Sequence, residues 1–198
     1  MSVLLPLCPP PLRISKSSAP HGQLILEQLR ACGITHVVAL PDNASKSLLE
    51  QLAVQPGIRL VGVTREGEAW AVAAGLWMGG SNPAVLMQNT GFLESGDALR
   101  GTAMRMRIPL LCLLTYRGYS TLPAGHRDRP PATPVDGCAL SQPDVDSCAL
   151  LFEPTLQAWG LPYDFLHDDT DVVKIHPTLD RAREREHPAA LLLTRDTT

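Results

Sequence analysis

Short runs of aliphatic residues alternate with segments of helical period along this chain, and this alternation limits the possible folds more than any other feature. When each strand is followed by a helix that returns the chain to the same edge, the strands form a mostly parallel sheet covered on both faces. We therefore expect an α/β fold with a doubly wound, mostly parallel six-stranded sheet. The expected strands span residues 35–40, 58–63, 84–88, 110–116, 163–166 and 189–193.

The segments between these strands predict helices, and two other stretches carry no such pattern. Residues 1–18 are rich in proline and serine, which predicts a flexible lead-in to a single domain at 19–198. Residues 117–146 are rich in Pro, Gly and Asp without any period, which predicts a long loop that is either functional or an ordered surface excursion. The expected helices span residues 21–31, 44–54, 66–78, 93–104, 148–159 and 171–186.

The composition argues against several classes of function. A net charge of −3 leaves no basic excess for binding nucleic acid. No apolar run approaches the roughly 18 residues of a membrane span, and no Lys or Arg precedes the apolar start of the chain, as it would in a signal peptide. The five cysteines form no CxxC pair, so we expect neither a disulfide framework nor a zinc site. A cytoplasmic protein fits these features best.

Glu66 stands at the start of a helix rich in small residues, directly after the strand at 58–63. This order places its carboxylate at the carboxyl edge of the sheet, where ligands bind in open α/β folds. The small residues around it leave room for a flat ligand. The alternative interpretation is that Glu66 and the neighbouring Glu68 only complement the helix dipole.

Small polar residues also follow two other strands, at the same edge of the expected sheet. Asp, Asn and Thr are preferred helix caps, so capping and ligand contact are both open for these positions. The residues are Pro41, Asp42 and Asn43 after the first strand and Gln88, Asn89 and Thr90 after the third.

Several motifs with known chemistry are missing. The chain lacks the GxGxxG and GxxxxGK[ST] loops that hold nucleotide phosphates and the GxSxG turn of serine hydrolases. This argues against a nucleotide-binding module and against a hydrolase. His126 and Asp128 lie in a Pro-rich loop without further spaced ligands, so we expect no metal site in this chain. Cys112 lies in an apolar run and is expected in the core.

Four segments have the sequence and the order of one known family. They are VALPD at 38–42, REGEA with AAG at 65–75, VLMQNTG at 85–91, and the pair Gly118 and Tyr119 after the fourth strand. From residue 21 to the last strand, the chain resembles the pyrimidine-binding (Pyr) domain of thiamine-diphosphate-dependent enzymes, most closely the α subunit of sulfopyruvate and phosphonopyruvate decarboxylases. The spacing from Glu66 to Gly75 is similar to the family's helix with the cofactor-activating glutamate.

The resemblance implies roles for individual residues. It implies that Glu66 is catalytic, because the family's glutamate hydrogen-bonds the aminopyrimidine ring of thiamine diphosphate and activates it for decarboxylation of a 2-oxo acid. For the anionic tail of sulfopyruvate or phosphonopyruvate it implies Asn89, Arg100 and Arg117, since the planar fork of arginine matches such oxygens. Each arginine could also be a solvated surface residue. The strand-end residues implied to bind the cofactor are Pro41, Asp42, Gln88, Asn89 and Thr90.

The chain departs from the family in one respect. Complete enzymes carry a second domain with a Gly-Asp-Gly motif and a following Asn, which binds the diphosphate through Mg²⁺. Here Asp136 and Gly137 lie in a loop, and no Asn follows Asn89. The resemblance therefore implies a β-type partner subunit that binds Mg²⁺, in a hetero-oligomer of α2β2 or larger. The alternative is a non-catalytic Pyr-like subunit with an assembly or regulatory role, which the intact Glu66 disfavours.

Overall fold

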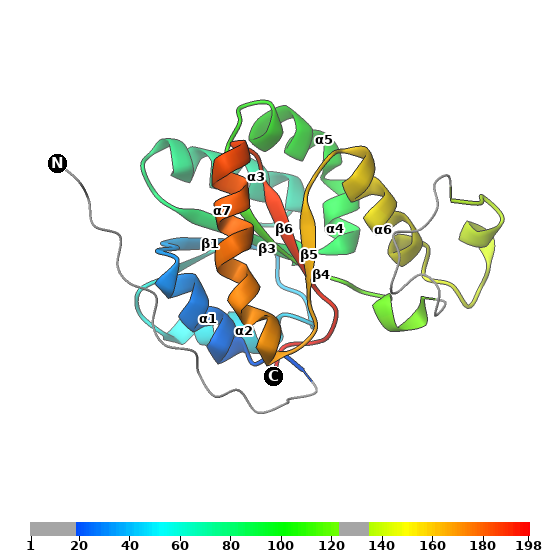
Figure 1. Cartoon of the computed structure of the whole chain (residues 1–198), viewed down its shortest axis with the longest axis horizontal. Coiled ribbons are helices and arrows are strands. Elements are labelled where there is room, and N and C mark those ends of the chain that lie inside the picture. The colour runs from blue at the N-terminus through cyan, green and yellow to red at the C-terminus, as the bar shows by residue number, and fades with distance from the viewer. Residues whose placement is uncertain (1–18, 123–134) are drawn as a thin grey trace.

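The computed structural model describes residues 19–122 and 135–198, and these contain a six-stranded sheet whose strands are all parallel (Figure 1). The strand order is β2-β1-β3-β4-β6-β5, so the prediction of a doubly wound α/β fold is confirmed. Each strand lies within one residue of its expected bounds. The strands are β1 (His36–Ala39), β2 (Arg59–Gly62), β3 (Pro83–Gln88), β4 (Leu111–Thr115), β5 (Tyr163–Leu166) and β6 (Ala189–Leu193).

Helices cover both faces of this sheet, because alternate side chains of each strand point to opposite sides. Val37 and Ala39 pack toward α1, α2 and α7, and Figure 1 shows α7 crossing in front of the sheet. Val38 packs on the other side, toward α3 to α6. The helices are α1 (Gly22–Ala31), α2 (Lys46–Val54), α3 (Glu66–Met78), α4 (Asn89–Glu94), α5 (Gly96–Leu99), α6 (Ser147–Ala158) and α7 (Ile175–Arg185).

The helix expected at 93–104 is interrupted and starts earlier. It consists of α4, α5 and a π-helical turn, η1 (Arg100–Met104). The break falls at Ser95, whose hydroxyl donates to the carbonyl of Phe92 and accepts a hydrogen bond from the Trp70 indole at 2.8 Å. A serine hydroxyl that bonds the backbone locally competes with the helical pattern, which explains the break.

The helix expected at 171–186 is also divided. A 3₁₀ segment, η5 (Asp169–Lys174), precedes α7. Pro177 lies in the first turn of α7, where it has no N–H to donate to the preceding turn. The chain therefore reaches the α-helical pattern only from Ile175 onward.

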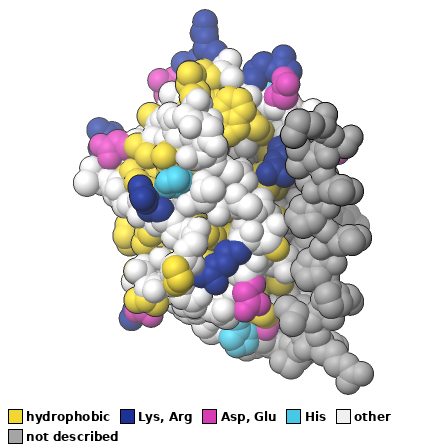
Figure 2. All heavy atoms as spheres, turned by 90° about the vertical axis from the view of Figure 1, so that its left-hand side faces the viewer, with side chains coloured by type: hydrophobic (Ala, Val, Ile, Leu, Met, Phe, Trp, Pro, Cys, Tyr) yellow, Lys and Arg dark blue, Asp and Glu magenta, His cyan; other side chains and the backbone are white. Residues whose placement is uncertain are grey.

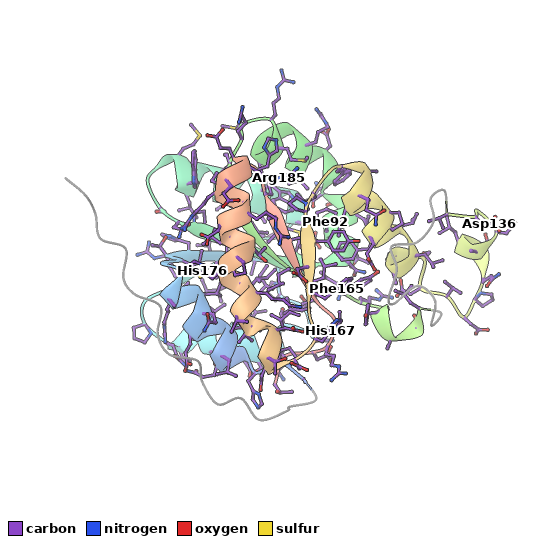
Figure 3. All side chains as sticks on the ribbon, viewed as in Figure 1. Phe92, Asp136, Phe165, His167, His176 and Arg185 are labelled. Atoms are coloured by element: carbon purple, nitrogen blue, oxygen red, sulfur yellow. The ribbon has the colours of Figure 1, made fainter. Side chains whose placement is uncertain are left out.

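The expected long loop at 117–146 contains two short 3₁₀ turns in its described parts, η2 (Tyr119–Thr121) and η4 (Ala139–Ser141). Asp136 accepts a hydrogen bond from the amide of Cys138 at 3.0 Å, and Figure 3 shows it well away from the sheet. His126 and Asp128, like the lead-in at 1–18, lie outside the described residues.

The edge strand β5 has the outward backbone groups of its second half bonded to side chains. Asp164 accepts from the amide of Phe165 at 2.8 Å, and Lys174 donates to the carbonyl of Phe165 at 2.8 Å. Asp171 accepts from the amide of His167 at 2.9 Å. The rings of Phe165 and His167 stack with centroids 5.5 Å apart at the end of this strand (Figure 3).

The surface in Figure 2 mixes apolar side chains with basic and acidic ones. Few large apolar side chains are exposed in the described chain, and Val54 and Met78 are the most accessible of them. Within the same residues, no helix combines the length and apolar character needed to cross a bilayer.

Candidate functional site

Glu66 is the first residue of α3, which begins four residues after the end of β2. The structure therefore places its carboxylate at the carboxyl edge of the sheet, and its side chain is half-buried. Among the residues that the structure describes, none hydrogen-bonds or pairs with this carboxylate. Glu66 thus has acceptor capacity available for a ligand.

Gly91, in the first turn of α4, lies directly against Glu66. A Cβ atom built on Gly91 would lie 2.1 Å from Oε1 of Glu66 and 2.3 Å from its Cδ. Only glycine allows this approach, because any larger residue would collide with the carboxylate. The contact brings Glu66 to the residues after β3, although β1 separates β2 from β3 in the sheet.

Glu68, one half-turn further along α3, bonds to the two residues that precede the helix. Its Oε2 accepts hydrogen bonds from the Thr64 amide at 3.0 Å, the Thr64 hydroxyl at 3.0 Å and the Arg65 amide at 3.2 Å. The Thr64 bonds hold the pKa of this exposed carboxyl below its ordinary value. Glu68 therefore stabilises the start of the helix, as the second half of a capping box does.

Asp42 joins two strand ends. Its Oδ1 accepts from the Ser45 amide at 3.0 Å, and its Oδ2 accepts from the Ser45 hydroxyl at 3.0 Å and from the Thr115 hydroxyl at 3.1 Å. Thr115 ends β4, so this half-buried carboxylate bridges the ends of β1 and β4 across β3. The preceding Pro41 is exposed. The capping interpretation describes the contacts of Asp42 well.

Gln88, Asn89 and Thr90 form a connected polar turn after β3. The buried Asn89 amide donates to the carbonyl of Arg117 at 3.0 Å, and its Oδ1 accepts from the Thr90 amide at 3.0 Å. The Thr90 hydroxyl donates to Oε1 of Gln88 at 2.6 Å. Asn89 therefore fixes the backbone that follows β4.

A cavity of about 270 Å³ opens at the carboxyl ends of β3, β4 and β6. Of the residues predicted from sequence to bind substrate, Arg117 lines it, whereas Arg100 does not. Arg100 is exposed near the end of α5 and pairs with Asp97 at 2.6 Å. The lining residues are Asn43, Ala44, Gln88, Tyr116, Arg117, Gly118, Tyr119, Ser120, Leu193, Thr194, Arg195 and Asp196.

Sequence reasoning did not single out the part of this lining that follows β6. Thr194, Arg195 and Asp196 come directly after a buried strand, so the rule that ligands bind at the carboxyl ends of parallel strands could have found them. Arg195 lies close enough to Asp168 to help lower the pKa of that carboxyl, although hydrogen bonds from Thr170 lower it more.

Arg117 is held at the cavity by an ion pair. Its Nε lies 3.2 Å from Oδ2 of Asp146, while Oδ1 of Asp146 accepts from the amide of Cys148 at the start of α6. Gly118 follows with φ of +81°, and a Cβ on it would lie 2.7 Å from the Cβ of Asp146. This close approach and the left-handed backbone both require glycine here.

A buried carboxylate, Glu153 of α6, lies behind this region. It accepts hydrogen bonds from the Tyr116 hydroxyl at 3.1 Å and the Tyr163 hydroxyl at 2.9 Å. Burial, with Glu153 nearby, raises the pKa of Tyr116 above its usual range, and burial raises the pKa of Tyr163 to about 12. Both tyrosines therefore stay protonated, and they hold α6 against the start of β5 and the residue after β4.

The described residues show no group of three or more His, Cys, Asp and Glu side chains that could hold a metal ion. The cysteines that the structure describes are free thiols. Cys112 is buried in β4, as expected, and burial raises its pKa.

Residues 21–132 match the family model described as thiamine pyrophosphate enzyme, N-terminal TPP binding domain. This segment includes every residue that the sequence predicted for the site, from Pro41 to Arg117. It does not include the cavity residues that follow β6.

Curated relatives agree with the family match. The chain is 36% identical over 97 residues to the sulfopyruvate decarboxylase subunit alpha of Methanothermobacter thermautotrophicus. The aligned segment covers 49% of this chain and 59% of that relative. It is 34% identical over 102 residues to the phosphonopyruvate decarboxylase of Streptomyces viridochromogenes, covering 52% of this chain and 25% of the relative. The alignment thus spans between a quarter and three fifths of these relatives.

Proposed function

Because the chain belongs to the thiamine pyrophosphate enzyme family through its N-terminal TPP binding domain, we propose that it is the Pyr (α) subunit of a two-chain thiamine-diphosphate-dependent 2-oxo acid decarboxylase. The observation that carries this proposal is the position of Glu66 and the lack of described partners for its carboxylate. Glu66 is half-buried at the carboxyl edge of the sheet, and no described residue bonds its carboxylate.

The residues around Glu66 fit an aminopyrimidine ring. Because Gly91 has no side chain, the Glu66 carboxylate can lie against it. The small residues of α3 leave room for a flat ring beside the carboxylate. Thiamine diphosphate, when bound, supplies the electron sink that a decarboxylation needs. In this proposal Glu66 shares a proton at a carboxylate oxygen with a ring nitrogen and so acts as a general acid and base.

The other strand-end residues shape the same edge. We assign Pro41, Asp42, Gln88, Asn89 and Thr90 to the lining of the cofactor site. The bond from Thr115 to Asp42 and the bond from Asn89 to the Arg117 carbonyl support this assignment, because they hold the ends of three strands in fixed positions. A site of fixed geometry costs less reorganisation when the ligand binds.

We assign the diphosphate and Mg²⁺ to a β-type partner subunit, in a hetero-oligomer of α2β2 or larger. The name "subunit alpha" of the sulfopyruvate decarboxylase relatives supports a partner chain. The active site would then lie between two chains. A cytoplasmic location completes the proposal, and the free cysteines of the described chain support it.

We propose sulfopyruvate as the first substrate and phosphonopyruvate as the second. The names of the relatives and the position of Arg117 on the cavity support an anionic tail. We also propose Arg100 as a ligand of this tail, with less support, since it pairs with Asp97 and does not line the cavity.

The test is reconstitution. The purified chain is incubated with thiamine diphosphate, Mg²⁺ and sulfopyruvate, alone and together with a partner chain that carries Gly-Asp-Gly and a downstream Asn, and carbon dioxide release is measured. We expect release only from the mixture. Turnover by this chain alone would contradict the two-chain proposal, and an inactive mixture would contradict the proposed reaction.

A further inference from the structure

The cavity at the ends of β3, β4 and β6 has the chemistry of an anion site. Arg117 and Arg195 line it together with residues that carry hydroxyl and amide side chains, and Asp196 is its one acidic lining residue. Its volume of about 270 Å³ is below the roughly 300–1,000 Å³ of drug-sized ligand sites. The cavity therefore suits a small acid.

The orientation of Arg117 leaves part of its guanidinium available. Asp146 pairs with Nε, and no described residue forms an ion pair with the two terminal nitrogens. Asp146 is itself fixed, because its other oxygen accepts from the amides of Cys148 and Ala149. An arginine that is anchored through Nε loses less entropy when its terminal nitrogens bind an oxyanion.

Arg195 reaches the same cavity from a different part of the chain. It follows β6, two residues after Leu193, and so lies outside the family-matched segment 21–132. The parallel pairing of β4 with β6, which ends at Thr115 and Leu193, places the residues after both strands side by side.

We propose that Arg195 is a specificity-determining residue that binds the sulfonate or phosphonate tail of the substrate together with Arg117, and that Asp146 is the positioning residue of Arg117. This inference rests on the proposed function. Two guanidinium groups match the charge and the several oxygens of a tetrahedral oxyanion, whereas a neutral methyl group in the same place offers no oxygen that a guanidinium can bind. The cavity thus selects sulfopyruvate over pyruvate.

The direct test is binding to the full chain without cofactor or partner. The probe is sulfoacetate, which carries the sulfonate tail but no 2-oxo group, and isothermal titration calorimetry measures its Kd. We expect Arg195→Gln to weaken binding about 10- to 100-fold, the range for hydrogen bonds to charged groups. Arg195→Lys keeps the charge but loses the planar fork, so its Kd should lie between those of the wild type and Arg195→Gln. Arg183→Gln is the matched control and should leave Kd unchanged, because Arg183 lies on α7 near Asp180 and outside the cavity lining.

Asp146 is tested in the reconstituted enzyme through the split between KM and kcat. Asp146→Asn keeps the shape of the cap but weakens the hold on Arg117, so KM for sulfopyruvate should rise while that for pyruvate stays the same. Circular dichroism checks that each variant is folded. Equal KM changes for both substrates would overturn the positioning role.

The outcomes separate this inference from the proposed function. Decarboxylation with an unchanged Kd in Arg195→Gln, or with no sulfoacetate binding by the chain, overturns the role of Arg195 and leaves the reaction standing. Sulfoacetate binding that depends on Arg195, in a reconstituted complex that decarboxylates nothing, supports the anion site and contradicts the proposed reaction.

Discussion

Around the ends of β2 and β1 the polar side chains bond to residues near them in the chain, whereas the ends of β3, β4 and β6 border an open cavity lined by two arginines. The first region lies within the family-matched segment, and the part of the second that follows β6 lies outside it. In the first region Glu66 is the carboxylate left without a described partner. Under the proposed function, the reacting group and the groups that select the substrate therefore belong to different stretches of the chain.

The largest effect is expected for Glu66→Gln, which keeps the shape of the side chain but removes its charge. General acid–base contributions are typically about 10²–10⁴-fold, and kcat of the reconstituted enzyme should fall by that order. Glu68→Gln should change kcat little, because residue 68 is rotated about 200° around α3 and already bonds Thr64. Exchange of the thiazolium C2 proton measures the step directly. Equal exchange rates in all three proteins would remove Glu66 from the mechanism.

The second effect concerns the contact between Gly91 and Glu66. Gly91→Ala places a methyl group 2.1 Å from the carboxylate, so the side chain must move. A displacement of about 1 Å can cost on the order of 100-fold in rate. The effect on stability should be small, because the atoms that the methyl group meets are the end of a flexible side chain.

The matched control for Gly91→Ala is Gly75→Ala on α3, where a Cβ meets nothing within 4 Å. It should preserve kcat and raise the free energy of unfolding by up to about 1 kcal/mol, because alanine favours the helix. Urea unfolding and kcat are measured for both variants. A similar loss of kcat in both variants would mean that the contact between Gly91 and Glu66 does not contribute to catalysis.

The smallest effect is on the pH dependence of stability. The Thr64 bonds lower the pKa of Glu68 in the folded state, so its contribution is complete above its ordinary pKa of 4.5 and is lost as pH falls through the lower folded pKa. Glu68→Gln should therefore lower Tm slightly at pH 7, and this difference should shrink as the pH is brought well below 4.5. A constant difference in Tm across this range would contradict the capping role.

The sheet could be predicted from sequence because hydrophobic period and strand length are local properties. The partners of side chains are not local. Glu66 and Glu68 are both first-turn carboxylates, and only the fold of Thr64 and Arg65 around Glu68 distinguishes them. The hydroxyl of Ser95, where the helix breaks, is bonded by the indole of Trp70, a residue 25 positions away.

The two predicted arginines show what the strand-end rule can and cannot decide. Arg117 follows β4 directly and lines the cavity. Arg100 follows Asn89 by eleven residues along a helical path, which at 1.5 Å per residue carries it roughly 16 Å toward the opposite edge. The helical rise alone therefore predicts that Arg100 lies away from this edge. The position of Arg195 at the cavity could be predicted only with the pairing of β4 with β6.

The side chains that bond the outer backbone of β5 have a consequence for assembly. Asp164, Asp171 and Lys174 occupy the amide and carbonyl of Phe165 and the amide of His167, which another strand would need. A second chain consequently cannot extend the sheet at this edge without first breaking charged hydrogen bonds. The same bonds disfavour edge-to-edge aggregation through β5.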